Sequence, residues 1–379
     1  MVSFREVNTS IDDISSYSLI EFTSDSSHDH NDLLLSLPTL PNDLLVEIFC
    51  RLPIKLLLQL RCLSKFLNSL ISDPKFTKKH LQMSTKNHHL ILTTKGESYV
   101  RSYPIQSILK FITINANIHN FPVNEKDFYI VGSCDGILCL VVNLFSIMLW
   151  NPSIKKFKLL PPVRSPFQSG SSANVAYGFG YDTLIENYKV VVVFIDASGN
   201  KSKIKVHALG TNFWRVVQRD IPVPVDGTLN FVSGTLNWFE DKDYNIVSFN
   251  LVNESYQIFM QPDYGIENVV SVNLGVLRDC LCILANTRDF FDVWQMKQFR
   301  NEESWSKLCR VPFCSYFSSI KEIWISDDDQ VFLVYTKLLR KNVVVFDINS
   351  STFKIPRIQK IDSLIEPKIY VESLISPCF

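Results

Sequence analysis

The most constraining feature of this sequence is a repeat of short strand-like segments that fills the chain from about residue 88 onward. Each unit has two runs rich in Val, Ile, Leu and Phe, then a turn and a third segment with an aromatic side chain. These third-segment aromatics, about 40 to 60 residues apart, are Phe157, Trp214, Tyr256, Trp305 and Phe353. Such a period, with several strands per unit, is typical of β-propeller blades.

One large aromatic side chain per unit has a physical explanation in a propeller. A blade is a small twisted sheet that cannot bury both faces alone, so large side chains fill the space between neighbouring blades. Five units are readable, and the strands before Cys134 can pair with the C-terminal run 368–375 to complete a sixth. That pairing would remove the open edges of a linear array. The sequence therefore predicts a mostly β chain with a propeller of about six blades, whereas a pair of β-sandwiches leaves the repeat unexplained.

Charge and hydropathy argue against nucleic-acid and membrane partners. The chain has 38 Lys plus Arg and 38 Asp plus Glu residues, so no overall field favours a polyanion. The longest apolar run, 137–150, is interrupted by Asn143 and Ser146 and is too short to span a bilayer. Residues 1–36 are polar and acidic without a secretory signal, and we expect them to be disordered.

The sequence contains no recognisable catalytic or metal-binding motif. Its nine cysteines lack disulfide-framework spacing, which indicates reduced thiols in an intracellular protein of the cytoplasm or nucleus. No histidine lies at zinc-finger spacing from the cysteines, so we expect no bound metal and no cofactor. Asp327–Asp329 is best explained as a hairpin turn. We expect a protein that is not an enzyme, although catalytic residues converging on a propeller channel would be invisible in one sequence.

The segment from Leu40 to Phe76 has a different, helical pattern. Pro41 opens a first helical run, and Pro53 ends it and begins a second. The apolar positions at helical spacing are Leu44, Leu45, Ile48, Phe49 and Leu52, then Leu56, Leu57, Leu60, Leu63, Leu67, Leu70 and Ile71. The second run is predicted to be one helix that is apolar around most of its circumference. Such a helix either belongs to a larger core or docks on another protein.

This segment resembles an F-box, the part of a substrate receptor that binds the Skp-type adaptor of an SCF ubiquitin ligase. The matching positions are Leu40, Pro41, Asp43, Leu44, Leu45, Glu47, Ile48, Arg51, Leu52, Pro53, Lys55, Leu57, Leu58, Arg61, Cys62, Lys65, Leu70, Ile71, Asp73, Pro74 and Phe76. The chain departs at Ser64, where plant members usually have Cys, and at Leu67, where they usually have Trp. Losing that Trp removes a large anchor and implies weaker adaptor binding or another adaptor isoform. The competing interpretation is an ordinary helical hairpin of the core.

The strand-rich part resembles the plant F-box-associated domain, which is often described as kelch-like. The matching phrases include IVGSCDGILCL from Ile130, LWNPSIKKFKLLP from Leu149, YGFGYDTLIENYKVV from Tyr177 and KIYVESLISP from Lys368. The glycine doublets of true kelch repeats are missing, so the kelch-like description applies to architecture alone. The resemblance implies a substrate-recognition domain.

Together the two resemblances imply a disordered segment 1–36, a helical F-box at 37–83 and a propeller-like domain at 84–379. The implied function is the substrate-recognition subunit of an SCF-type ubiquitin ligase, with a Skp-type adaptor, a cullin and an unidentified protein substrate as partners. The expected adaptor-binding residues are Pro41, Leu44, Ile48, Leu52, Pro53, Leu56, Leu60 and Leu67. The candidate substrate loops are 161–172, 219–227 and 287–291. The alternative is an F-box propeller scaffold that acts outside a ligase with weakened adaptor binding.

Overall fold

The computed structural model describes residues 41–84, 87–94, 96–110, 115–123, 128–143, 145–167, 174–217, 221–265, 269–312, 319–326, 330–337, 340–356, 358 and 364–378. The described residues from Asp43 to Cys378 belong to one compact unit. The predicted disordered segment 1–36 and the predicted turn Asp327–Asp329 lie outside the described residues. The domain boundaries given above stay predictions.

The helical module contains α1 (Asn42–Phe49), α2 (Ile54–Leu60), α3 (Lys65–Ser72) and α4 (Pro74–Ser84). The prediction of one helix after Pro53 is wrong, because the chain turns after Leu60 and α3 starts anew. The Ser64 hydroxyl accepts a hydrogen bond from the Leu67 amide at 3.1 Å and so caps the new helix. Asp73 caps α4 in the same way, with its Oδ1 accepting from the Lys75 amide at 2.8 Å.

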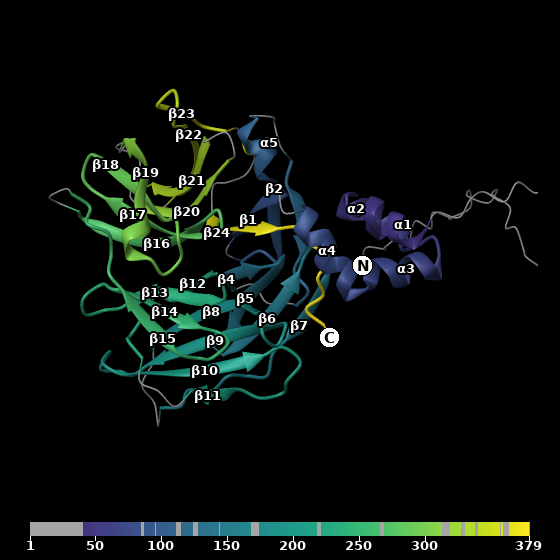
Figure 1. Ribbon diagram of the computed structural model, residues 1–379, viewed down its shortest axis with the longest axis horizontal. Coiled ribbons are helices and arrows are strands. Elements are labelled where there is room, and N and C mark those ends of the chain that lie inside the picture. Colours follow the sequence, from purple (N-terminus) through teal and green to yellow (C-terminus); the bar gives the residue numbers. More distant parts are fainter. Residues whose placement is uncertain are drawn as a thin grey trace, which may run out of the picture. The chain divides into compact units, whose positions relative to one another are not determined.

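The described strands form six four-stranded antiparallel blades, numbered here from the N-terminal one (Figure 1). Blade 1 contains β24 (Leu364–Val371), β1 (His88–Thr94), β2 (Tyr99–Pro104) and β3 (Asn117–Asn120), and α5 (Ile105–Leu109) follows β2. Blade 2 contains β4 (Tyr129–Cys134), β5 (Ile137–Asn143), β6 (Ser146–Asn151) and β7 (Lys156–Leu159). Blade 3 contains β8 (Val175–Asp182), β9 (Asn187–Ile195), β10 (Ser202–Ala208) and β11 (Arg215–Val217).

The remaining three blades follow the same order along the chain. Blade 4 contains β12 (Thr228–Val232), β13 (Thr235–Phe239), β14 (Ile246–Asn250) and β15 (Tyr256–Phe259). Blade 5 contains β16 (Ser271–Leu277), β17 (Cys280–Asn286), β18 (Phe290–Met296) and β19 (Trp305–Pro312), with the short 3₁₀ helix η1 (Glu302–Ser304) before β19. Blade 6 contains β20 (Ser319–Ile325), β21 (Gln330–Lys337), β22 (Arg340–Asp347) and β23 (Thr352–Lys354).

Blades 3 and 4 are joined into one eight-stranded sheet by a short parallel pairing between β8 and β12. The pairing matches Thr228 with Tyr177 and Leu229 with Gly178. Glycine at 178 permits this close approach, because a Cβ atom there would lie 2.6 Å from Leu236 Cδ1. The phrase Tyr-Gly-Phe-Gly-Tyr from Tyr177 lies within β8.

The two ends of the propeller meet in blade 1, where β24 pairs with β1. The register sets His89 opposite Tyr370 and Leu90 opposite Ile369. This confirms the prediction that the C-terminal run completes a blade with the strands before Cys134. Closing the ring in this way gives β1 a partner on both sides, β24 and β2, so that β1 is not an open edge.

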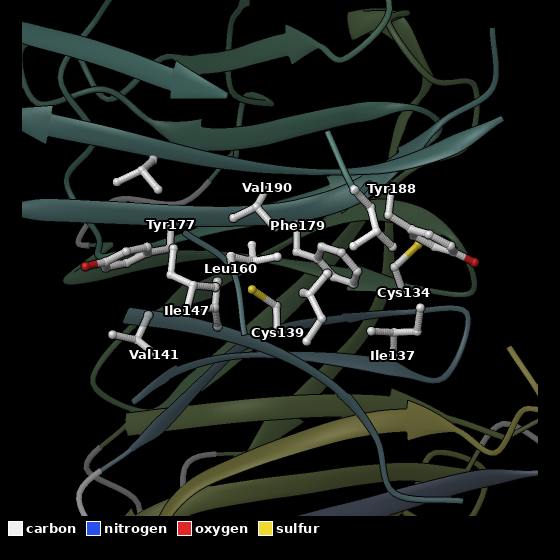
Figure 2. Packing of buried hydrophobic residues seen from close by; sticks show 14 of the residues in the cluster. Cys134, Ile137, Cys139, Val141, Ile147, Leu160, Tyr177, Phe179, Tyr188 and Val190 are labelled. Atoms are coloured by element: carbon white, nitrogen blue, oxygen red, sulfur yellow. The ribbon is translucent and has the colours of Figure 1, made fainter. Parts of the chain in front are cut away.

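A layer of buried apolar side chains separates each pair of neighbouring blades. Pairs of residues in these layers, one from each blade, are Ile91 and Leu138, Val131 and Phe179, Val193 and Trp238, Phe239 and Leu281, Phe291 and Val331, and Leu92 and Val345. Figure 2 shows the layer between blades 2 and 3, where Tyr177 and Phe179 face Ile147 and Cys139, and Tyr188 lies beside Cys134. The blades are thus held together mainly by hydrophobic burial.

Four of the five repeat aromatics take part in these layers, as the repeat predicts. Trp214, Tyr256, Trp305 and Phe353 pack against the interblade clusters. The prediction is wrong for Phe157, which lies on the outer strand β7 with 38% of its surface exposed. Blade 2 instead buries Trp150 on β6, which contacts Phe121 edge to face at 5.7 Å.

Candidate functional site

Helix α1 presents an apolar side to solvent. Leu44 and Ile48 lie one helical turn apart and are 53% and 48% exposed. Leu56 on α2 adds a third large apolar side chain that is 40% exposed. Exposed leucine and isoleucine side chains on successive helices are unusual for a surface that stays in water, and they indicate a docking face.

Two further large apolar side chains of the helical module are exposed, and the sequence did not mark them as adaptor-binding residues. Leu63 is 72% exposed in the turn after α2, and Phe66 is 51% exposed in the first turn of α3. Leu63 and Phe66 lie on either side of Ser64, where the predicted single helix is interrupted. The signal in the sequence was the serine itself, a strong N-cap residue three positions before an apolar residue.

The other predicted binding residues lie deeper in the module. Leu52, Leu60 and Leu67 are half-buried and pack against a core made by Cys50, Ile54, Leu57, Ile71 and Phe76. Pro41 and Pro53 are exposed. The structure therefore divides the predicted set into an outward-facing group on α1 and α2 and a group that also stabilises the helices.

The helical module 42–84 carries more Lys and Arg than Asp and Glu residues. Arg51 and Lys79 hold Glu47 at 2.6 Å and 3.1 Å, and these contacts lower the pKa of Glu47 below its usual value. Lys55 and Lys65 are exposed on α2 and α3. An apolar centre with a polar, charged rim is the usual anatomy of a protein–protein interface.

A buried histidine ties the first two helices to α4. His80 is 1% exposed, and its Nε2 lies 3.0 Å from the carbonyl oxygen of Leu52. Burial lowers the pKa of His80, so the ring is neutral near pH 7 and donates to that carbonyl. The turn between α1 and α2, which carries Leu52 and Pro53, is fixed by this contact.

Two family models match the chain in these same parts. The F-box domain model matches residues 37–79, and the F-box associated beta propeller domain model matches residues 88–377. The chain belongs to the F-box-associated β-propeller family. Its helical module is the F-box, and its six blades are the F-box-associated domain.

Curated relatives in this family come from Arabidopsis thaliana. The F-box/kelch-repeat protein At3g23880 is 29% identical over 358 residues, an alignment that covers 89% of this chain and 96% of that protein. The F-box protein CPR1 is 27% identical over 376 residues, covering 90% of this chain and 89% of that protein. Among solved structures, a chain of a nidogen/laminin complex is similar over 75% of this chain and 99% of its own, with 14% identity and a TM-score of 0.43.

The predicted substrate loops of this F-box protein lie at one end of the blades. The β8–β9 turn lies beside the F-box, since Lys78 Nζ on α4 is 2.7 Å from Glu186 Oε2. Because strands alternate in direction, the loops β7–β8, β11–β12 and β17–β18 belong to the opposite ends of the strands. We call this the distal face, and it holds the described parts of the predicted segments 161–172, 219–227 and 287–291. Residues 168–172 and 219–220 lie outside the described residues.

Metal binding, membrane crossing and thiol reactivity can each be judged from the described residues. They contain no group of three or more His, Cys, Asp or Glu side chains arranged to hold a metal ion. None of the described helices has the length and apolar character needed to cross a membrane. The described cysteines carry free thiols, and burial raises the pKa of Cys134 and Cys139 well above the usual value, which makes them poor nucleophiles.

Proposed function

We propose that this chain is the substrate-recognition subunit of an SCF-type ubiquitin ligase. Its F-box would bind a Skp-type adaptor and, through it, a cullin, while loops of the distal face bind a protein substrate. The observation that carries the proposal is that five large apolar side chains of the helical module are exposed, namely Leu44, Ile48, Leu56, Leu63 and Phe66. Such a surface fits into a hydrophobic groove of a partner.

In this function the chain performs no bond chemistry of its own. It holds the substrate near the ubiquitin-carrying subunit, so that a reaction between two molecules becomes effectively intramolecular. Membership of the family supports this role. We place the complex inside the cell, in the cytoplasm or nucleus.

Adaptor binding is the first property to test. We would co-express the chain with a plant Skp-type adaptor and analyse the mixture by size-exclusion chromatography, expecting a stoichiometric complex. The double substitution Leu44→Asp and Ile48→Asp should abolish the complex, because each buried apolar side chain contributes about 1.5 to 3 kcal/mol and buried charge costs more. Ile355→Asp is the matched control, since Ile355 is 73% exposed on blade 6. Unchanged binding by the double variant would reject the assignment.

A second function is favoured by the leucine at position 67. If Leu67 weakens the adaptor interface, the chain acts as a propeller scaffold outside a ligase. The two functions differ in whether a cullin purifies together with the chain and the adaptor. A cullin at stoichiometric amount supports the ligase subunit, and a folded chain that binds no adaptor supports the scaffold.

A further inference from the structure

The residues that follow β24 connect the propeller to the F-box core. Ser373, Leu374 and Ile375 are almost fully buried, with 0%, 5% and 5% of their surfaces exposed. Leu374 belongs to the apolar core of the F-box helices, whereas Ile375 belongs to the layer between blades 2 and 3. Adjacent residues of an extended segment point to opposite sides, so this segment contributes to both cores at once.

Hydrogen bonds fix the segment on blade 2. The fully buried Asn151 Nδ2 donates to the carbonyl oxygens of Ser373 at 3.0 Å and Ile375 at 2.8 Å. The Ser373 hydroxyl donates to the carbonyl oxygen of Asp135 at 2.6 Å. Because these bonds engage backbone and buried side chains of the propeller alone, they hold the segment without help from the F-box.

A glycine makes room for this attachment. Gly136 follows Asp135 in the β4–β5 turn with φ +78°, a conformation that favours glycine. A Cβ atom at this position would lie 2.3 Å from Ser373 Oγ and 2.6 Å from the carbonyl oxygen of Val371. The turn is therefore shaped to receive the C-terminal segment.

On the F-box side, Leu374 completes a core that is small by itself. Its neighbours in the cluster are Leu57, Ile71 and Phe76, which are at most 3% exposed, and the half-buried Ile154 from the β6–β7 turn packs against them. At the edge, Lys78 Nζ lies 2.7 Å from Glu186 Oε2. A helical module of about 40 residues rarely buries enough apolar surface to be stable alone.

We propose that residues 373–375 are an intramolecular docking segment that fixes the F-box helices to the propeller. The segment runs between blade 2 and the F-box helices near the C-terminus (Figure 1). It gives the F-box helices a folded surface to pack against. It also keeps the exposed side of α1 at a constant orientation to the distal face. A substrate on that face would then be held at a fixed distance from the adaptor.

Hydrogen–deuterium exchange of the full chain tests the docking segment without any adaptor. In the Leu374→Ala variant, amides of α2, α3 and α4 should exchange roughly tenfold faster or more, since removing a buried leucine leaves a cavity. Amides of β4, β5 and β6 should be unchanged, because the bonds to Asn151 and Asp135 do not need the Leu374 side chain. Leu374→Asp should increase the effect on the helices further.

Ile355→Asp is the matched control, since Ile355 is 73% exposed on blade 6 and should leave exchange in the helices unaltered. Unchanged protection of the helices in both Leu374 variants would overturn the proposal. An equal loss of protection in blade 2 would also overturn it, because Leu374 would then serve the propeller and not the F-box. Neither outcome depends on whether a Skp-type adaptor binds.

Discussion

Lys189 and Asp182 face each other across the start of β9 and the end of β8, with Lys189 Nζ 2.7 Å from Asp182 Oδ2. Both side chains are almost fully buried, at 7% and 1% exposed. Lys189 also donates to the carbonyl oxygen of Leu251 at 2.6 Å and lies 3.3 Å from Glu254 Oε1. One ammonium group thus links blade 3 to the β14–β15 turn of blade 4.

Replacing Lys189 by methionine should destabilise the propeller strongly. The substitution keeps the length of the side chain but leaves the Asp182 carboxylate buried without its cation. Removing one partner of a buried pair costs about 3 to 5 kcal/mol. Urea unfolding at pH 7 should show this loss, and Lys203→Met, on an exposed lysine of the neighbouring strand β10, should cost far less. If Lys189→Met lowered the free energy of unfolding by less than Lys203→Met, the Lys189–Asp182 ion pair would add little to stability.

The stability of the chain should fall in acid through the same pair. Burial alone would raise the pKa of Asp182, but the contacts with Lys189 and with the amides of Leu184 and Ile185 outweigh it and lower the pKa. A carboxyl whose pKa is lower when folded stabilises the protein above the unfolded value of about 3.9. That contribution is lost as the pH falls below about 4 and through the folded pKa.

Urea midpoints measured between about pH 3 and pH 7 test this dependence. The wild-type chain should lose stability toward the acid end, and Lys189→Met should show a smaller loss. Asp292 contributes in the same direction, because Arg310 and Lys307 overcome the effect of burial and lower its pKa. Equal slopes in the wild-type chain and the Lys189 variant would contradict the role of the Asp182 pair.

Gly180 is the position where an added methyl group should be least tolerated in β8. A Cβ atom there would lie 2.2 Å from Phe231 Cδ2, and Phe231 packs in the layers on both sides of blade 3. Gly180→Ala should therefore cost about 1 to 3 kcal/mol through overpacking. Phe231→Leu in the same chain should recover part of this loss, as measured in a double-mutant cycle of thermal unfolding. Additive effects of the two substitutions would reject the contact as the cause.

Leu67→Trp should strengthen binding of a Skp-type adaptor. Leu67 is half-buried beside the F-box core, so a larger ring must extend outward from it and adds contact area for the partner. Tryptophan anchors often dominate an interface, and we expect a dissociation constant about tenfold lower. Isothermal titration with the purified adaptor measures the change. An unaltered affinity would mean that other residues, such as Phe66, already supply the anchor.

Much of the fold follows from local patterns in the sequence. The spacing of strand pairs and aromatics predicts about six blades, and the run 368–375 predicts the closing strand in blade 1. These predictions succeed because a blade is built from neighbouring strands joined by short turns, so its pattern is contiguous in the chain. The family resemblance of residues 40–76 likewise rests on a contiguous run.

One detail of the candidate site was missed because hydrophobic periodicity alone does not show a helix break, although Ser64 marked this one. Sequence periodicity joined α2 and α3 into one helix, and so it did not separate the exposed Leu63 and Phe66 from the half-buried Leu60 and Leu67.

The sequence by itself determined the class of the protein, the repeat of its blades and the helical F-box pattern, because short-range periodicity encodes them. Only the tertiary structure decided that Leu374 turns toward the F-box while Ile375 turns toward the propeller. That choice is made by Asn151 and Asp135, more than 200 residues earlier in the chain. A side chain's direction in an extended segment is fixed by its hydrogen-bonding partners, and those partners become neighbours only when the ring closes.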